Sequence, residues 1–201
     1  HARKVLLKGG VIAFPTDTFY GLGVDPFNRD AVDQIFAIKG REKKKPLLLL
    51  ISAREQLETL VRNITPAHST LMQEFWPGPL TLLFEPRSVI LDNVSAGLIG
   101  IRQPGNSMTR DLISSFGQAI TAPSANLSGE APPTSAKQVE QSLGSHLDLI
   151  IDGGTCPGGE PSTLVDATET PVRLIRPGAI PFSDIKVALR GNTKPNQPEV
   201  L

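Results

Sequence analysis

The chain has 201 residues, 39% of them hydrophobic, which is enough to bury one sizeable core and predicts a single domain. Its 20 basic residues balance 20 acidic ones, which argues against wholesale coating of a nucleic acid or an anionic membrane but leaves room for a local basic pocket. A single cysteine excludes an intrachain disulfide and fits a reducing compartment, so we expect a cytoplasmic protein, and no apolar run approaches the ~20 residues that cross a bilayer.

Short apolar segments rich in Val, Ile and Leu predict eight strands, several of them apolar on both faces, as in a sheet covered by helices on both sides. In chain order these are residues 11–14, 47–51, 80–84, 99–102, 119–122, 147–151, 163–165 and 172–175. Amphipathic segments with recognisable caps predict the helices between them. The helices start at Asn28, at a capping box of Ser52 and Glu55 that turns Leu57, Leu60 and Val61 inward, at Thr65–Pro66, at Asn106 or Ser107, at Ser135 and at Ser183.

Strands and helices alternate along the whole chain, which is typical of the α/β class. The connections are not uniformly long enough for an all-parallel sheet, so we expect a mixed one. No repeat or internal linker divides the chain. The domain is predicted to cover residues 1–191, and residues 192–201 are predicted to form a loose polar tail.

The most strongly charged segment lies between a predicted helix and a buried strand. Its positive potential suits phosphate or carboxylate, because an arginine can grip an anion with two parallel hydrogen bonds while lysines act as movable charges. The alternative is a solvated run that complements the dipole at a helix end. The five cations of this segment are Lys39, Arg41, Lys43, Lys44 and Lys45.

Two loops follow predicted strands, where ligand sites of α/β proteins form. Residues 121–129 carry Ser124, Asn126 and Ser128, which suit either nucleotide contacts or a hydrogen-bonded turn. Residues 14–23 carry three hydroxyl groups, a carboxylate and a bare G-x-G, which is weak evidence for phosphate binding and also fits a simple turn. Arg102 and Arg176 each end a predicted strand, from which an arginine can pair with a ligand or an acid.

Several catalytic patterns are absent from the sequence. It has no Walker, Rossmann or H-E-x-x-H motif and no nucleophile elbow, and its three histidines lack metal-ligand spacing, so we expect no metal bound by protein side chains. A reaction here would depend on cations and positioning rather than on a nucleophilic side chain. Phosphoryl or nucleotidyl transfer fits that profile.

Taken in order, these segments resemble the YrdC-like family, the threonylcarbamoyl-AMP synthases, over almost the whole chain. The signature is K-x-R at Lys39 and Arg41, followed far downstream by S-x-N at Ser124 and Asn126. The supporting segments are Pro15-Thr16-Asp17-Thr18, Tyr20-Gly21-Leu22, Trp76-Pro77-Gly78-Pro79, Ile101-Arg102, Ser162-Thr163 and Arg176-Pro177-Gly178.

The resemblance implies a twisted mixed β-sheet flanked by helices, with a positively charged cavity on one face. It implies a nucleotidyltransferase that joins L-threonine, bicarbonate and the AMP part of ATP and releases pyrophosphate, with Mg²⁺ carried by the ATP phosphates. Partner enzymes then transfer the threonylcarbamoyl group to an adenosine of tRNA, which this chain contacts only weakly, and no membrane takes part.

Residue by residue, the resemblance implies catalytic charges at Lys39 and Arg41. The implied ATP-binding residues are Lys39, Arg41, Lys45, Ser124, Asn126, Thr134 and Arg176. The implied threonine-binding residues are Thr18, Arg102, Ser124 and Ser162, with Arg102 suited to the carboxylate. Leu50 stands where some relatives carry a histidine, which removes one expected contact with threonine.

Two other functions fit part of the pattern. A module that only binds RNA through the same basic cavity would bind it tightly and in a salt-sensitive way without ATP chemistry, but the balanced charge and the single Trp and Tyr offer no stacking platform. A related carbamoyl-handling module occurs inside larger hydrogenase-maturation proteins, whose zinc-binding cysteines this chain lacks.

Overall fold

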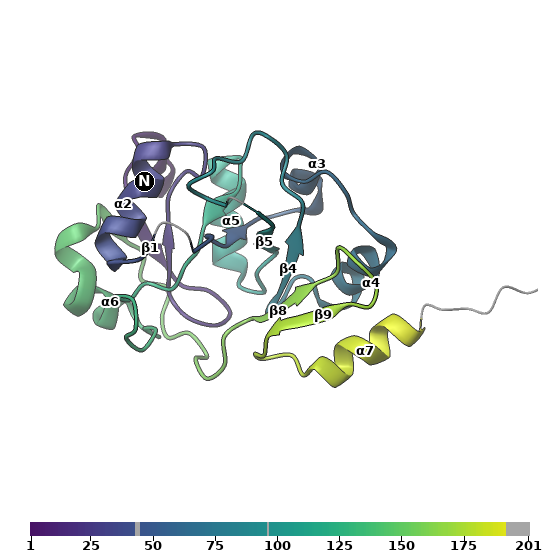
Figure 1. Cartoon of the computed structure of the whole chain (residues 1–201). Coiled ribbons are helices and arrows are strands. Elements are labelled where there is room, and N and C mark those ends of the chain that lie inside the picture. The colour runs from purple at the N-terminus through teal and green to yellow at the C-terminus, as the bar shows by residue number, and fades with distance from the viewer. Residues whose placement is uncertain (43–44, 96, 192–201) are drawn as a thin grey trace, which may run out of the picture.

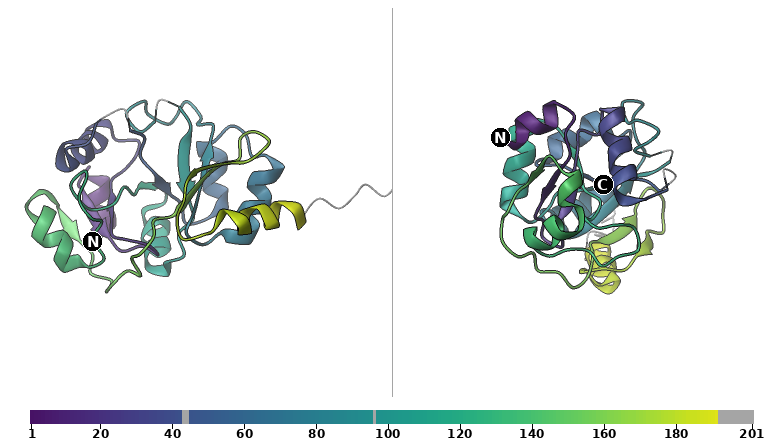
Figure 2. Two further views of the ribbon diagram at one scale, coloured as in Figure 1. Left: turned by 60° about the horizontal axis from the view of Figure 1, so that its bottom comes forward. Right: turned by 90° about the vertical axis from the view of Figure 1, so that its left-hand side faces the viewer.

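The computed structural model describes residues 1–42, 45–95 and 97–191. Helices α2 and α6 lie at one end of the molecule, and α4 and α7 lie at the other (Figure 1). The left view of Figure 2 shows the same separation of the two ends. The predicted tail, residues 192–201, lies outside the described residues. The helices are α1 Ala2–Leu7, α2 Arg29–Lys39, α3 Leu57–Leu60, α4 Pro66–Phe75, α5 Ser107–Phe116, α6 Ala136–Leu143 and α7 Phe182–Gly191.

The strands form two hydrogen-bonded sheets that together confirm the predicted α/β fold with mixed strand pairing. The smaller sheet has the order β2-β1-β7 and the larger the order β6-β3-β5-β4-β8-β9. Each contains parallel and antiparallel pairs. The strands are β1 Ile12–Phe14, β2 Gly21–Gly23, β3 Leu49–Leu50, β4 Leu80–Phe84, β5 Ile99–Arg102, β6 Ile120–Thr121, β7 Leu149–Ile150, β8 Thr163–Asp166 and β9 Arg173–Arg176.

The two sheets meet where β2 runs beside β6 and the residues after it. The Leu22 amide donates to the Pro123 carbonyl over 2.8 Å, and the Ala125 amide donates to the Tyr20 carbonyl over 2.8 Å. The Thr121 hydroxyl adds a further hydrogen bond between the two segments, because it accepts from the Val24 amide at 3.0 Å. This seam holds the loop before β2 against the loop after β6, which are the two loops singled out in the sequence.

Strand β2 and helix α1 were not among the predicted elements. Glycine is depleted in strands, so Gly21-Leu22-Gly23 was interpreted as part of a turn. In the structure these glycines leave room for an aromatic ring, because a Cβ atom on Gly23 would lie 2.8 Å from Phe14 Cε1. The bare G-x-G is therefore a strand that packs against Phe14.

Most of the predicted helix starts are confirmed, but the capping box at Ser52 is wrong. Gln56, not Glu55, reaches back there, and its Oε1 accepts from the Ser52 amide over 2.7 Å. Because Gln56 makes this contact, the chain forms a 3₁₀ turn, Arg54–Gln56, before α3 begins. The side chains that accept from an amide three residues on, as predicted, are those of Asn28, Thr65, Asn106 and Ser135.

The core consists of two clusters of buried side chains. The larger cluster includes Tyr20 and Phe84, and the smaller one packs Phe14 and Leu50 against Ile113 of α5. All of these side chains are fully buried. Among the described residues, no helix has the length and apolar character needed to cross a membrane.

Candidate active site

Lys39 lies in the last turn of α2, which ends at Gly40 in a left-handed conformation with φ of 57°. Its side chain is only 3% exposed although it carries a charge. The ammonium donates to the carbonyl of Ser124, to the carbonyl of Asn126 at 2.7 Å and to the Asn126 Oδ1 at 3.4 Å. Burial, followed by the nearby charge of Arg41, lowers the pKa of Lys39 to about 8. The predicted phosphate-binding lysine therefore also holds the loop that carries the S-x-N pair.

The side chain of Asn126 braces that same loop. Its Nδ2 donates to the Leu127 carbonyl at 2.9 Å and to the Glu130 carbonyl at 2.7 Å. The structure thus brings Lys39, Ser124 and Asn126 together, as the resemblance implies. In this arrangement Asn126 shapes the loop, and the half-buried Ser124 side chain is the member of the S-x-N pair better placed to meet a ligand.

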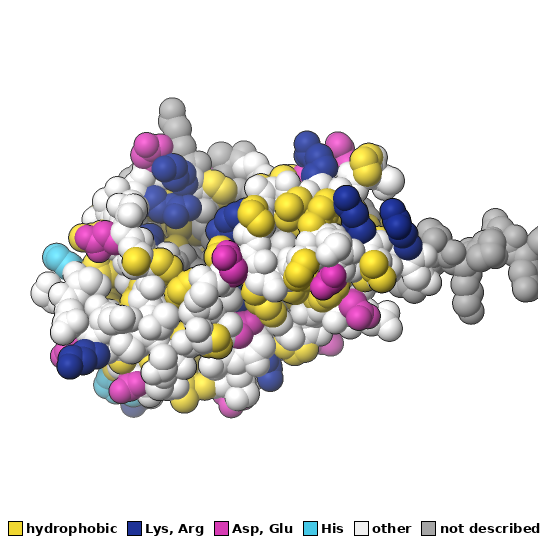
Figure 3. All heavy atoms as spheres, turned by 90° about the horizontal axis from the view of Figure 1, so that it is seen from below, with side chains coloured by type: hydrophobic (Ala, Val, Ile, Leu, Met, Phe, Trp, Pro, Cys, Tyr) yellow, Lys and Arg dark blue, Asp and Glu magenta, His cyan; other side chains and the backbone are white. Residues whose placement is uncertain are grey.

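Three arginines from distant parts of the chain form a cluster. Burial, followed by the positive charge of Arg176, lowers the pKa of Arg41. Burial also lowers the pKa of Arg102, which the nearby Asp17 raises and the charge of Arg176 lowers. Arg41 donates to the Pro46 carbonyl at 3.0 Å, while its buried Nε has no partner. Seen from below, Lys and Arg side chains gather beside a hollow between the two ends of the molecule (Figure 3). Such a cluster suits a ligand with several negative charges.

The residues predicted to surround threonine lie around this cluster. Arg176 donates through one nitrogen to the Ser162 carbonyl at 2.9 Å and to the Ser162 hydroxyl at 3.2 Å. The Ser162 hydroxyl also lies 2.8 Å from the hydroxyl of Thr81 on β4. The buried hydroxyl of Thr18 lies 3.1 Å from that of Thr16. Arg102 forms an ion pair of 2.7 Å with Asp17, the residue next to Thr18.

Thr134, Lys45 and Leu50 make contacts that do not involve the arginine cluster. Thr134 lies just before α6, where its hydroxyl donates to Gln138 Oε1 at 3.2 Å. Lys45 is exposed, and its amide donates to the Glu42 carbonyl at 3.1 Å. Lys43 and Lys44, the other lysines of the charged segment, lie outside the described residues. Leu50 is fully buried in the smaller core cluster.

The sequence did not single out two residues that shape this region. Asp17 was assigned no role of its own in the site, and its partner lies 85 positions away along the chain. Tyr20 donates its hydroxyl to the Gly154 carbonyl at 2.8 Å and accepts from the Gly153 amide at 3.3 Å. It thereby fixes the loop after β7 over the segment that holds Thr18. The signal in the sequence was their place in two segments that carry the family resemblance, Pro15-Thr16-Asp17-Thr18 and Tyr20-Gly21-Leu22.

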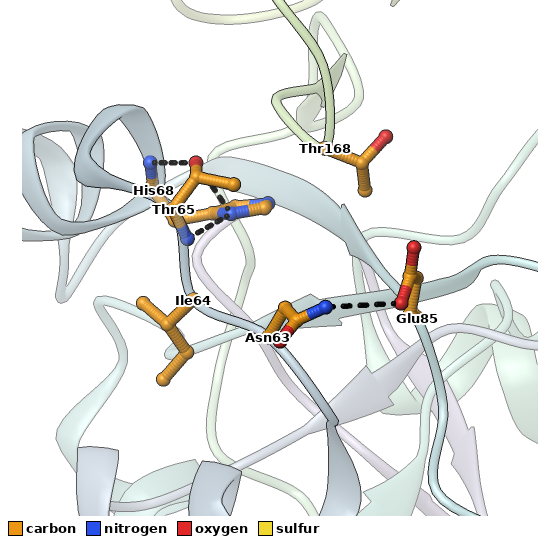
Figure 4. Close-up of a pocket in the computed structure, with 6 residues that line it drawn as sticks. All are labelled: Asn63, Ile64, Thr65, His68, Glu85 and Thr168. Atoms are coloured by element: carbon orange, nitrogen blue, oxygen red, sulfur yellow. Dashed lines mark hydrogen bonds between the residues drawn. The ribbon is translucent and has the colours of Figure 1, made fainter.

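Two pockets of the structure lie elsewhere. One, with a volume of about 280 Å³, is lined by Asn63, Ile64, Thr65, His68, Glu85 and Thr168 (Figure 4). The other, of about 590 Å³, includes Phe27, Leu60 and Val89 in its lining. Neither contains a predicted site residue. In the first pocket the His68 ring already serves the helix start, because its Nδ1 accepts from the Thr65 amide at 3.1 Å.

Comparisons with known proteins identify the family of this chain. The family model Sua5/YciO/YrdC, described as telomere recombination, matches residues 4–178. Threonylcarbamoyl-AMP synthase of Pyrococcus abyssi is 40% identical over 187 residues, which cover 92% of this chain and 55% of that protein. The enzyme of the same name from Coxiella burnetii is 37% identical over 169 residues, which cover 83% of this chain and 90% of that protein. The chain spans about half the length of the Pyrococcus relative.

A solved structure shares the fold over nearly the whole chain. The crystal structure of P. abyssi Sua5 complexed with L-threonine superposes with a TM-score of 0.91 and 38% sequence identity, over 94% of this chain and 56% of that one. The family model alone covers far more than half of the sequence. The chain therefore belongs to the Sua5/YciO/YrdC family.

Proposed function

We propose that this chain is a threonylcarbamoyl-AMP synthase, a nucleotidyltransferase that converts L-threonine, bicarbonate and ATP into threonylcarbamoyl-AMP, pyrophosphate and water. Relatives at 40% and 37% identity carry this name, and a relative of 38% identity has been crystallised with L-threonine.

The convergence of Arg41, Arg102 and Arg176 is the observation that carries the proposal. The positive charge of Arg176 acts on both Arg41 and Arg102. Arg176 donates to the Ser162 hydroxyl, and Arg102 pairs with Asp17, the residue next to Thr18. The two substrates together bring a triphosphate, a carboxylate and a side-chain hydroxyl. A cluster of fixed cations next to small hydroxyl groups matches that combination, because carboxylate and phosphate oxygens accept paired hydrogen bonds from guanidinium.

The chemistry needs no nucleophilic side chain. The amine of threonine adds to carbon dioxide supplied by bicarbonate, giving N-carboxy-threonine and water. A carbamate oxygen then attacks the α-phosphorus of ATP, and the bond between that phosphorus and the oxygen bridging to the β-phosphate breaks, so pyrophosphate leaves with the electron pair. Arg102 holds the threonine carboxylate, while Arg41 and Arg176 balance the charge that grows on the phosphates. Mg²⁺ arrives on ATP as part of that substrate.

Each cation of this kind acts mainly by being in place before the charge develops. Removing one preorganised donor typically costs about 2–4 kcal/mol of barrier, or about 10²–10³ in rate. Lys39 contributes charge from within the cluster and fixes the loop of Ser124. We further propose that the product passes to partner enzymes that modify an adenosine of tRNA, and that the chain acts in the cytoplasm, where ATP is supplied.

The test mixes folded protein, ATP, Mg²⁺ and bicarbonate with and without L-threonine, and follows pyrophosphate and the adenylate by mass spectrometry. We expect pyrophosphate release that depends on both threonine and bicarbonate, with a matching threonylcarbamoyl-adenylate. Arg29→Ala serves as the control for arginine substitutions within the cluster and should keep wild-type activity, because Arg29 is an exposed arginine paired with the exposed Asp92. Folded wild-type protein that releases no pyrophosphate overturns the proposal, and salt-sensitive RNA binding by that protein would favour an RNA-binding module instead.

A further inference from the structure

Asp17 is an acidic residue within a cluster of positive charge. One of its carboxylate oxygens, Oδ1, lies 2.7 Å from Nη1 of Arg102. The side chains are largely removed from water, with 15% of Asp17 and 3% of Arg102 exposed. A buried guanidinium needs a counter-charge, since breaking a buried pair leaves an uncompensated charge in a poorly solvating place. Asp17 supplies that charge to Arg102, which also lies within the electrostatic influence of Arg176.

The surrounding chain restricts the position of the Asp17 carboxylate. Gly105 lies under it, so that a Cβ atom built on Gly105 would be 3.2 Å from the Asp17 Oδ2 and 3.4 Å from its Cβ. The preceding turn is tied down from the other side, because the Thr109 hydroxyl of α5 donates to the Pro15 carbonyl at 2.5 Å. Gly105 and the tied-down turn therefore restrict where the Asp17 carboxylate can lie, and its one hydrogen-bonded oxygen is the one paired with Arg102, since the buried Oδ2 has no hydrogen-bond partner.

Arg102 keeps donor capacity beyond this pair. Its Nε is buried and has no hydrogen-bond partner, while Asp17 occupies Nη1. A guanidinium held at one nitrogen and unsatisfied at another is ready to receive a second carboxylate. The cost of a buried unpaired donor falls when such a ligand arrives, which makes the site favour a bound carboxylate.

We propose that Asp17 is a positioning residue for threonine: it holds the Arg102 guanidinium in the orientation in which Arg102 grips the substrate carboxylate. Asp17 acts through Arg102 and does not touch the reacting atoms. The inference rests on the proposed function. Asp17 is thereby assigned to threonine binding and not to ATP binding. Removing its negative charge should weaken the binding of threonine, whereas the positive charges of the arginines should still attract the ATP phosphates.

The main experiment compares Asp17→Asn with wild type in the pyrophosphate-release assay, varying L-threonine and ATP separately. We expect the KM for threonine to rise about 10- to 100-fold, the loss typical of a hydrogen bond to a charged group, with no rise in the KM for ATP. Asp166→Asn is the matched control, because Asp166 is a buried carboxylate paired with Arg173 at 2.6 Å, at the end of the β8–β9 pair away from Arg176. It should melt at a lower temperature without changing the KM for threonine.

A second variant moves Asp17 without altering its charge. Gly105→Ala presses a methyl group against the Asp17 carboxylate and should raise the KM for threonine in the same direction. Gly97→Ala is its control, since a Cβ atom there meets nothing within 4 Å. Gly105→Ala also decides the question if Asp17→Asn fails to fold.

The outcomes separate the two proposals. Wild-type protein without pyrophosphate release overturns the proposed function. An active wild type together with folded variants at Asp17 and Gly105 that keep the wild-type KM for threonine overturns the positioning role alone. Equal rises in the KM for threonine and for ATP would likewise overturn it, because they would indicate a general distortion of the site.

Discussion

Replacing Lys39 with methionine separates two roles that the lysine can play. The sequence predicts that its ammonium binds ATP phosphates, and the structure shows it donating to the carbonyls of Ser124 and Asn126 and to the Asn126 side chain. Methionine keeps a long unbranched side chain but has no proton to donate. If the ammonium holds the loop, Lys39→Met must destabilise the protein in the absence of any ligand.

The magnitude follows from the contacts that are lost. The buried carbonyl of Asn126 and the part-buried carbonyl of Ser124 lose their donor, and an unsatisfied buried group costs about 1–3 kcal/mol. Part of this is offset because the variant no longer buries an ammonium, whose pKa of about 8 reflects that burial. We expect a net loss of about 2 kcal/mol in the free energy of unfolding, which lowers the melting temperature of a chain of this size by about 4–8 °C.

The assay is thermal unfolding of ligand-free protein, with Arg41→Met as the matched control. Arg41 is the other residue of the K-x-R pair, and its guanidinium donates to the carbonyl of Pro46, not to the Ser124 loop. The control should melt close to wild type. A Lys39→Met protein that melts at the wild-type temperature without ligand would refute the reasoning, and would leave phosphate binding as the sole role of the lysine.

Three further predictions concern catalysis, pH and packing. Arg41→Ala should keep the fold and lower turnover about 10²–10³-fold in the pyrophosphate assay, and near-normal turnover would contradict its assignment. Burial lowers the pKa of His68 below 6.5, so the unfolded chain takes up a proton first. The contribution of His68 to the free energy of unfolding should therefore be fully present above pH 6.5. It should fall on acidification by up to about 1.4 kcal/mol per pH unit in denaturant titrations, and His68→Gln should lack this contribution to the slope. Gly178→Ala should cost about 3 kcal/mol or more, because its Cβ atom would lie 2.2 Å from the Pro161 carbonyl oxygen, whereas Gly191→Ala, with nothing within 4 Å, should be nearly neutral in the same titrations.

Apolar pattern and cap chemistry predicted most of the fold because both are local. The caps at Asn28 and Thr65 are confirmed, since a side chain three residues from an unpaired amide has little else to bind. Strand β2 was missed for the opposite reason. Its glycines are explained by the ring of Phe14, and that contact depends on which strands become neighbours.

The same distinction applies to the site. The loops that carry Thr18 and Ser124 could be chosen from the sequence because each follows a predicted strand. The partners of the charges could not be chosen, since Arg102 pairs with Asp17 and Lys39 binds carbonyls near Ser124 across more than 80 positions of sequence. Main-chain carbonyls carry no signature in the sequence at all, so the loop-holding role of Lys39 becomes visible only in the structure.

The site is assembled from residues spread between Asp17 and Arg176, and this has a consequence during synthesis. During synthesis Lys39 and Arg102 leave the ribosome well before Ser162 and Arg176, because they precede these residues in the sequence. Ligands that need the whole cluster cannot bind a shorter nascent chain. They can stabilise the finished fold by mass action, yet they cannot guide its first steps, which must depend on the apolar core alone.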